Sequence, residues 1–308
     1  ARVERDSMDL LQAAHTFSGI EMALWDLLGQ HRQLPVWKIL GFEKATPKIP
    51  YASLLFGDTA DETLARARNA LADGFSAVKF GWGPIGTLDA ASDTDHFVAA
   101  REGIGNDGHL MIDVGQIFVE DIEAAAARLP ALEQAQAYWL EEPFSGHAFE
   151  AYADLAARSP NVGIAGGEAA HNIAMARHLM DFGKVKFVQI DCGRIGGIGP
   201  AFEVAQLAQV RGVTYVNHTF TTHLALSASL QPFAGIADAR ICEYPAHPSA
   251  LALAVVANSI TRNQAGEVFA PDAPGLGVKV DTEALKPYLV DTEIKVGGKV
   301  IYATPSLG

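Results

Sequence analysis

Seven ionisable residues recur through the middle of the sequence at intervals close to the length of one strand followed by one helix. They are Lys79, Asp113, Glu141, Glu168, Asp191, His218 and Glu243. From Asp113 onward, the successive intervals are 28, 27, 23, 27 and 25 residues. Each residue stands at the end of a short apolar segment that is typical of a buried strand. The spacing therefore predicts one ionisable group at the carboxyl end of each successive strand, all facing one shared site.

Asp113, Glu141 and Glu168 supply three carboxylates from three adjacent strands. Brought together, these groups would repel one another, and burial would raise that cost. A hard divalent cation removes the repulsion, and an all-oxygen ligand set suits Mg²⁺ or Mn²⁺. No histidine or cysteine belongs to the set, which argues against zinc. The alternative of solvated or ion-paired carboxylates fits any one of them better than all three at repeat spacing.

Asp191 and His218 end the next two strands, which predicts a carboxylate beside an imidazole. Such a carboxylate fixes the tautomer of the ring and raises the basicity of its far nitrogen. His218 is therefore the candidate general acid or base, with Asp191 as its partner. His223 is a rival, but it begins the following helical segment, so we favour His218.

Lys79 and Glu243 each have two interpretations. Lys79 is expected either to hold a substrate carboxylate or enolate oxygen, or to be a lysine that extends its charge outward from a strand end. Glu243 is expected either to hydrogen-bond or protonate the substrate, or to form a buried salt bridge. Glu142 follows Glu141 directly, and neighbouring strand residues face opposite sides, so Glu142 is expected to point into the wall.

Short segments rich in β-forming residues alternate with alanine-rich helical segments along the chain. The strand candidates are Ile49–Leu55, Ala77–Trp82, His109–Val114, Ala137–Glu142, Val162–Gly167, Lys186–Asp191, Val213–His218 and Ile241–Tyr244. The helix candidates between them are Asp61–Leu71, Phe97–Ile104, Ile122–Ala131, Ala148–Ala157, Ile173–Phe182 and Ala201–Val210. This alternation predicts an α/β fold, a parallel (β/α)8-type barrel. A six-stranded doubly wound sheet is the competing fold, but the segment that follows Tyr51 lacks a glycine-rich phosphate turn.

The two ends of the chain depart from this alternation. Apolar residues at helical spacing predict a helix over Leu10–Leu28, and Pro35 opens a short helix that Gly41 closes. After residue 258, a turn-rich segment precedes a predicted hairpin over Glu293–Tyr302, with Gly297 and Gly298 at its turn. We expect this terminal segment to pack back across the barrel.

Composition narrows the classes of protein further. The 308 residues carry 36 acidic and 23 basic side chains, a net charge of −13, which disfavours binding to nucleic acid or to an anionic membrane. Apolar residues make up 49% of the chain, so it is not disordered. Two cysteines, no long apolar run and no signal peptide predict a cytoplasmic protein. Apolar surfaces on the first helix and the terminal segment predict a homo-oligomer.

Several motifs together resemble those of the enolase superfamily, in its mandelate racemase subgroup. In chain order they are GIEMALWD (19–26), AVKF (77–80), ID (112–113), WLEEP (139–143), AGGE (165–168), QID (189–191), NH (217–218) and PGLG (274–277). The resemblance implies a modified (β/α)7β TIM-type barrel with an α+β capping domain. It divides the chain into a helical part of the capping domain (1–46), the barrel (47–250) and a segment packed back on both (251–308).

The resemblance also implies a chemistry. It places Mg²⁺ on Asp113, Glu141 and Glu168, with Asp191 and His218 as the catalytic dyad. The implied reaction begins with abstraction of the proton next to a carboxylate, and the metal stabilises the resulting enediolate. The substrate is then a small-molecule carboxylate.

Three departures from the pattern of the family narrow this implication. Members often carry Lys-x-Lys on the second barrel strand, where the second lysine is a base facing the histidine, but here Gly81 stands in its place. The third strand usually continues Asp-x-Asn, but here it ends with Gly115. The strands that normally begin the capping domain are also missing, so we interpret the sequence as truncated at its N-terminus.

A missing second base favours elimination over racemisation, because a racemase needs a base on each face of the enediolate. One residue suffices to remove the proton and to protonate a leaving hydroxide on the same face. We therefore expect dehydration of an aldonate or aldarate to a 2-keto-3-deoxy acid, with Lys79 assisting. The alternatives are a racemase or epimerase, a lactone cycloisomerase, and a barrel that binds without catalysis. An unused cluster of buried carboxylates argues against the last of these.

Polar groups near the strand ends are candidates for selecting the substrate. They are Tyr51, Ser53, Trp82, His171, Asn172, Arg194 and Thr219. His171 and Asn172 are expected to bind sugar hydroxyls, whereas Arg194 is equally expected to form a structural salt bridge. The number of these groups favours a polyol acid over an aromatic or aliphatic one.

Overall fold

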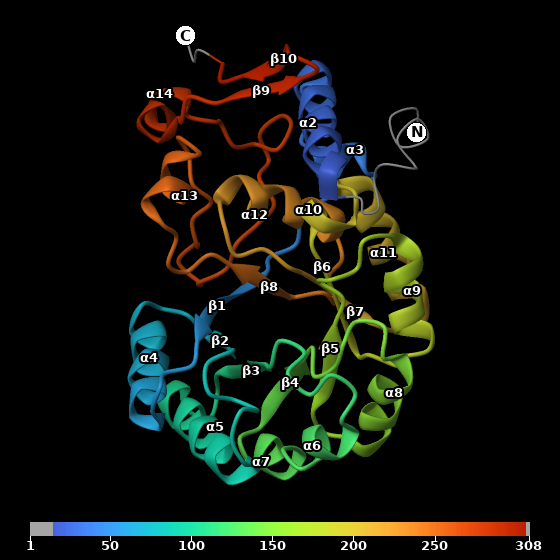
Figure 1. Cartoon of the computed structure of the whole chain (residues 1–308), viewed down its shortest axis with the longest axis vertical. Helices are drawn as coiled ribbons and strands as arrows, with labels where there is room; N and C mark the ends of the chain where they lie inside the picture. The colour runs from blue at the N-terminus through green and yellow to red at the C-terminus, as the bar shows by residue number, and fades with distance from the viewer. Residues whose placement is uncertain (1–14, 306–308) are drawn as a thin grey trace.

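Eight parallel strands form the centre of the protein in a computed structural model that describes residues 15–305 (Figure 1). The strands are β1 (Ile49–Leu55), β2 (Ala77–Gly81), β3 (His109–Asp113), β4 (Ala137–Glu141), β5 (Gly163–Gly166), β6 (Phe187–Ile190), β7 (Thr214–Asn217) and β8 (Ile241–Tyr244). They pair in the order β7-β6-β5-β4-β3-β2-β1-β8. Sequential neighbours with β8 returning beside β1 make a TIM-type barrel and exclude the doubly wound sheet.

Helices follow the strands and cover the outside of the barrel (Figure 1). They are α4 (Ala60–Ala72), α5 (Ala90–Ile104), α6 (Ile122–Ala126), α7 (Leu129–Gln134), α8 (Phe149–Arg158), α9 (Ile173–Asp181), α10 (Cys192–Ile195), α11 (Ile198–Arg211), α12 (His223–Leu230) and α13 (Ala250–Ala254). Side chains commonly cap their first turns, as Thr59 does for α4 and Asp89 for α5. The helices bury their apolar faces against the outer side of the sheet in one large cluster.

The barrel interior is filled by one apolar side chain from each strand. The cluster consists of Tyr51, Ala77, Met111, Trp139, Ala165, Phe187, Val216 and Ile241. Large rings stand beside small alanines, and Tyr51 meets Trp139 edge to face at 5.7 Å. This packed layer leaves no pore, so the open end of the barrel above it becomes a cavity with a solid floor.

The side chain of Asn217 closes the barrel between β7 and β8. Its Nδ2 donates to the carbonyl of Glu243 at 3.2 Å, and its Oδ1 accepts from the amide of Glu243 at 2.9 Å. The amide group therefore takes the place of two backbone partners across this seam. Because Asn217 precedes His218, this closure also fixes His218 next to Glu243.

Helices α2 (His15–Arg32) and α3 (Val36–Ile39) lie at the same end of the molecule as the C-terminal hairpin, β9 (Glu293–Val296) and β10 (Lys299–Ala303), whose residues are all exposed (Figure 1). The contacts between the N-terminal helices and the C-terminal part come from residues before the hairpin. Leu276 donates its amide to Asp26 of α2 at 2.8 Å, and Pro35 pairs with Gly275. The terminal hairpin, β9 with β10, is antiparallel, and two short helices, α14 (Thr282–Leu285) and η2 (Lys286–Tyr288), precede it. Residues 10–14 of the expected first helix lie outside the described residues.

The predicted strands match the structure closely, whereas the predicted helices differ from it most clearly at α5 and at α6 with α7. All eight strands lie within one residue of the predicted limits. The helix expected over Ile122–Ala131 is instead two short helices, because Pro130 has no amide to donate and its ring clashes with a continuing turn. Helix α5 begins at Ala90, seven residues before the predicted Phe97, because Asp89 caps it. No described helix is long and apolar enough to cross a bilayer.

Glu21 anchors α2 to the barrel. Its carboxylate accepts the amides of Ile198 at 2.7 Å and Gly199 at 2.9 Å, the first free amides of α11. A carboxylate at a helix N-terminus is favoured by both the free amides and the helix dipole. We expect Glu21→Ala to lower the free energy of unfolding by about 1–3 kcal/mol. Chemical denaturation checks this value, and an unchanged midpoint would contradict the anchoring role.

Lys48 is buried beneath the barrel without a carboxylate partner. Its Nζ donates to Thr46 Oγ1 at 2.9 Å and to the carbonyls of Ile236 and Ala239 at 2.8 and 2.9 Å. Burial lowers the pKa of Lys48 to about 7. In the unfolded chain the pKa is about 10.4, so between these values the unfolded state binds more protons.

The stability contributed at Lys48 is therefore expected to rise as the pH increases from about 7 to 10. The comparison is with Lys48→Met, which lacks the titrating group. The free energy of unfolding of the wild type minus that of Lys48→Met should increase over this range in urea titrations. A difference that stays constant with pH would contradict a lowered pKa.

Candidate active site

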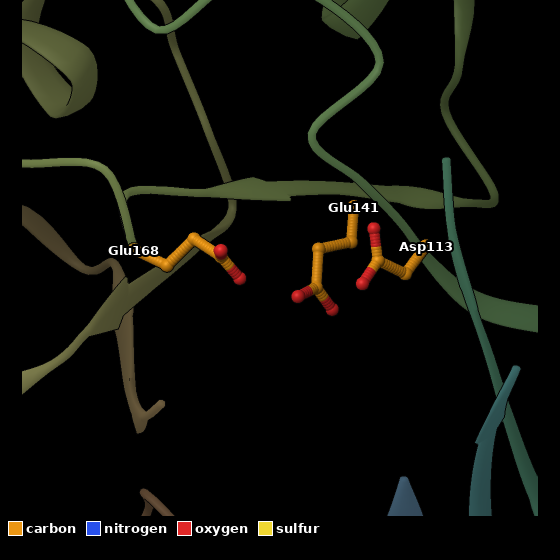
Figure 2. A group of neighbouring side chains, drawn as sticks. All are labelled: Asp113, Glu141 and Glu168. Carbon is orange, nitrogen blue, oxygen red and sulfur yellow. The ribbon is translucent and has the colours of Figure 1, made fainter. Parts of the chain in front are cut away.

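The three predicted metal ligands meet at the open end of the barrel. Asp113 ends β3, Glu141 ends β4, and Glu168 lies just after β5. One oxygen from each lies within 4.8 Å of the others, and Figure 2 shows the three carboxylates turned toward a common space. Asp113 and Glu168 line a cavity of about 400 Å³ together with Lys79, Arg194, His218 and Glu243, while Glu141 lies buried behind this lining. Neighbouring strands in register therefore deliver the side chains that the spacing predicted.

The chemistry of these donors fits a hard divalent cation. Burial, followed by the neighbouring carboxylates, raises the pKa of Asp113 and brings that of Glu141 to about 8, although Lys79 opposes both shifts. Glu141 is completely buried. A buried set of repelling carboxylates is stabilised by a cation, and oxygen donors alone select Mg²⁺ or Mn²⁺ over softer metals.

Lys79 is enclosed by carboxylates. Its Nζ lies 2.7 Å from Glu141, 3.3 Å from Glu243 and 3.5 Å from Asp113. Burial alone would lower the pKa of Lys79, but Glu141 and Glu243 hold it well above the ordinary value. Lys79 is therefore held as an ammonium ion that offsets the charge of the surrounding carboxylates.

His218 lies between two carboxylates. Its Nδ1 is 2.8 Å from Asp191 Oδ2, and its Nε2 is 3.0 Å from Glu168 Oε2. Burial lowers the pKa of His218, but Glu243, Asp191 and Glu168 outweigh burial and raise it to about 10. Burial has the opposite effect on a carboxyl group and would raise the pKa of Glu168. His218, Lys79 and Arg194 outweigh burial and lower the pKa of Glu168 to about 2. Glu168 contacts Nε2 of His218 and is also a candidate metal ligand. A cation bound to Glu168 would therefore change the charge of the imidazole.

Asp191 uses its two oxygens for different tasks. Oδ1 accepts the amide of Gly193 at 2.6 Å and so caps α10, while Oδ2 meets His218. The cap holds the carboxylate still, which favours the tautomer of His218 that carries its proton on Nδ1. The rival histidine, His223, begins α12 and accepts the amide of Ile260 at 3.2 Å, away from the cavity.

Glu243 and Glu142 both lie buried beside the site. Glu243 accepts the amide of Thr219 at 2.6 Å and pairs with Lys79, which is the arrangement of a buried salt bridge at the cavity wall. Glu142 accepts a hydrogen bond from Gln116 at 3.0 Å. Glu142 does not line the cavity described above.

The structure brings three of the proposed substrate-binding residues to the cavity, Ser53, Trp82 and Arg194. Arg194 Nη1 lies 2.9 Å from Glu168 Oε1, so this arginine forms a salt bridge at the cavity wall.

Tyr51, His171, Asn172 and Thr219 are placed elsewhere. Tyr51 lies in the barrel interior, and its hydroxyl has no partner in the described structure. Asn172 caps α9 by accepting the amide of Met175, and His171 packs against His15 with ring centroids 4.5 Å apart. Thr219 borders a smaller cavity of about 150 Å³ behind His218. Fewer neutral hydroxyl-binding groups therefore face the main cavity than the sequence predicted.

Sequence reasoning missed several residues that line the cavity. They are Leu54, Leu55, Phe220, Pro245, Ala246 and His247. Phe220 meets the ring of His218 with centroids 5.5 Å apart, and His247 lies on the loop after β8. The only available signal was their position at or just after strand ends, because five of the six are apolar and carry no chemistry that the sequence alone reveals.

Two family models match the chain. One, described as enolase C-terminal domain-like, matches residues 62–284, which include every strand of the barrel except β1. The other, the mandelate racemase / muconate lactonizing enzyme N-terminal domain, matches residues 4–41. The chain therefore belongs to the enolase superfamily, in its mandelate racemase subgroup.

Two of the relatives have names that refer to acid sugars. The chain is 29% identical to a 3,6-anhydro-alpha-L-galactonate cycloisomerase from Streptomyces coelicolor, covering 89% of this chain and 72% of that protein. It is 29% identical to a D-galactonate dehydratase from Klebsiella pneumoniae, with 86% and 71% covered. A crystal structure of a predicted mandelate racemase from Rhodobacter sphaeroides is 63% identical, with a TM-score of 0.95 and 98% and 78% covered. The names of these relatives thus include both a dehydratase and a cycloisomerase.

Proposed function

We propose that this protein is a Mg²⁺-dependent acid-sugar dehydratase that converts an aldonate or aldarate to a 2-keto-3-deoxy acid. The observation that carries the proposal is the asymmetry of the site. His218 is the one imidazole paired with a carboxylate among the described residues that line the cavity, while Lys79 is held as an ammonium ion by three carboxylates. A site with a single base favours elimination over racemisation.

The proposed reaction balances with His218 alone. With a cation held on Glu168, the ring of His218 would lose its extra proton. Neutral His218 would then remove the proton from C2 through Nε2, while Asp191 holds the opposite ring nitrogen. The C3–O bond then breaks on the same face, and the imidazolium returns the proton to the leaving hydroxide, which departs as water. The resulting enol becomes the 2-keto-3-deoxy acid. No second base and no external co-reactant are required.

The other charged residues support this reaction. Asp113, Glu141 and Glu168 would hold the cation. Bound Mg²⁺ would supply Lewis-acid stabilisation of negative charge that develops on the substrate carboxylate. Lys79 keeps the buried carboxylates neutralised and places a positive charge near the same developing charge. Arg194, at the cavity wall beside Glu168, is suited to bind a substrate oxygen.

A cycloisomerase is the second candidate function. It is favoured by relatives such as the 3,6-anhydro-D-galactonate cycloisomerase from Zobellia galactanivorans, whose structure is 30% identical with a TM-score of 0.85 and 94% and 80% covered. The proton abstraction is the same, but the leaving oxygen is a ring atom and stays on the product, so no water is released. A racemase or epimerase receives less support, since Gly81 offers no base on the other face.

Incubation with Mg²⁺ and a panel of aldonates, aldarates and cyclic sugar acids tests the proposal. A 2-keto-acid assay should give a product from at least one open-chain acid, and EDTA should abolish it. Product from cyclic acids only would transfer the assignment to the cycloisomerase. Epimers without any keto acid would reject both eliminations.

A further inference from the structure

Trp82 is an exposed tryptophan in a strained conformation at the edge of the cavity. It follows β2 directly, lines the cavity, and leaves 61% of its surface exposed. Its φ is +58°, a region that bulky side chains avoid. Its amide donates to the carbonyl of Asp113 at 3.3 Å, which ties this conformation to a candidate metal ligand.

One face of the indole is seated on Gly115. A Cβ at position 115 would lie 3.1–3.3 Å from three fused-ring atoms, Cε2, Cζ2 and Cδ2. Three nearly equal distances describe a ring that lies flat over the glycine. The missing asparagine side chain at this position therefore makes room for Trp82. Since one face is covered, most of the surface is exposed and the residue lines the cavity, we take the opposite face of the indole as the one that a ligand can reach.

This open face belongs to the wall formed by β2 and β3, whereas His218 lies on the wall formed by β7. Gly81, also on β2, directly precedes Trp82. A Cβ at position 81 would lie 3.2 Å from Asp113 Oδ2, so the backbone is already close to that carboxylate. Gly115 thus lies against the ring of Trp82, and Gly81 lies against the side chain of Asp113.

We propose that Trp82 is a specificity-determining residue whose open indole face binds the C–H face of the sugar carbons that His218 does not attack. The proposal rests on the proposed function and specifies how the substrate is held. The π face is negative and the C–H bonds of a sugar are weakly positive, so the two attract and exclude water. Open-chain and ring-shaped sugar acids share this C–H surface.

Binding measured without turnover separates this proposal from the proposed function. The probes are D-gluconate, an open-chain acid, and tetrahydrofuran-2-carboxylate, a ring acid, each titrated with Mg²⁺ present. If the keto-acid assay shows that gluconate is consumed, the same titrations use proteins that also carry His218→Asn. The other three tryptophans are buried or half-buried. Ligand protection of wild-type fluorescence against acrylamide therefore reports mainly on Trp82. The dissociation constants are compared by calorimetry in wild type, Trp82→Phe and Trp82→Ala.

We expect protection in the wild type and a dissociation constant about tenfold higher in Trp82→Ala for at least one probe, with Trp82→Phe in between. A change with gluconate alone identifies an open-chain substrate, and a change with the ring acid alone identifies a cyclic one. Phe182→Ala, an exposed aromatic that does not line the cavity, should leave both constants unchanged.

Unchanged dissociation constants in Trp82→Ala, or wild-type fluorescence that neither probe protects, would overturn the proposal that Trp82 binds the substrate. Once a substrate is known, Trp82→Ala should raise KM with little change in kcat, as expected for loss of uniform binding. Failure of the proposed function would appear separately, as absence of keto acid in a wild type that still binds a probe through Trp82.

Discussion

His218→Asn should lower kcat by about 10²–10⁴-fold, the usual contribution of a positioned general acid–base group. The variant keeps a polar side chain, but it has no nitrogen that can take the proton. Asp191 remains capped on Gly193, and the three candidate metal ligands remain in place. Magnesium affinity, measured by calorimetry, should therefore persist while keto-acid formation is lost.

His223→Asn is the matched control for this prediction. His223 is also buried, but its Nδ1 accepts a backbone amide at the start of α12 and does not reach the cavity. Its replacement should affect stability more than kcat. Near-normal turnover in His218→Asn would contradict the assignment of the base, whatever the control shows.

Lys79→Met should destabilise the metal-free protein by about 3–5 kcal/mol, the usual cost of removing one partner from a buried ion pair. The substitution keeps the side-chain stem and removes the charge that neutralises Glu141 and Glu243. It also removes a cation that competes for the carboxylates of the candidate metal site. Mg²⁺ should consequently raise the unfolding midpoint more in Lys79→Met than in the wild type.

Arg128→Met provides a comparison at a buried ion pair outside the site. Arg128 meets Asp93 at 2.9 Å between α5 and α7, and both side chains are buried. This variant should lose stability too, but Mg²⁺ should not restore it beyond the wild-type effect. Equal responses to Mg²⁺ in the two variants, in thermal unfolding with and without EDTA, would refute a role for Lys79 in balancing the metal site.

Most of the barrel could be predicted because its signals are local. Buried strands appear as short runs of β-forming residues, and the repeat length orders them around the ring. The start of α5 was missed because Asp93 and Asp95 resemble loop residues in the sequence. Asp93 is in fact buried against Arg128, a contact 35 residues away. Such pairing cannot be seen before the fold is known.

The site was predictable where position along a strand determines direction, and less so elsewhere. Asp113 and Glu141 end their strands, so alternation places them at the mouth. Tyr51 is the third residue of β1, far from the end of the strand, and it fills the barrel interior instead. Asn172 caps a helix. Phe220 was missed as a cavity residue because it lies in a loop, and its position depends on packing against His218.

The central claim is that one base, His218, drives elimination from a sugar acid, and proton NMR in D₂O tests it most directly. Wild-type protein with Mg²⁺ and its best substrate from the panel should produce a 2-keto-3-deoxy acid with deuterium at C3, and no C2 epimer should appear. His218→Asn should produce neither product nor exchange. Deuterium at C2 of an epimerised substrate, without keto acid, would show that protons reach both faces and would contradict the single-base account.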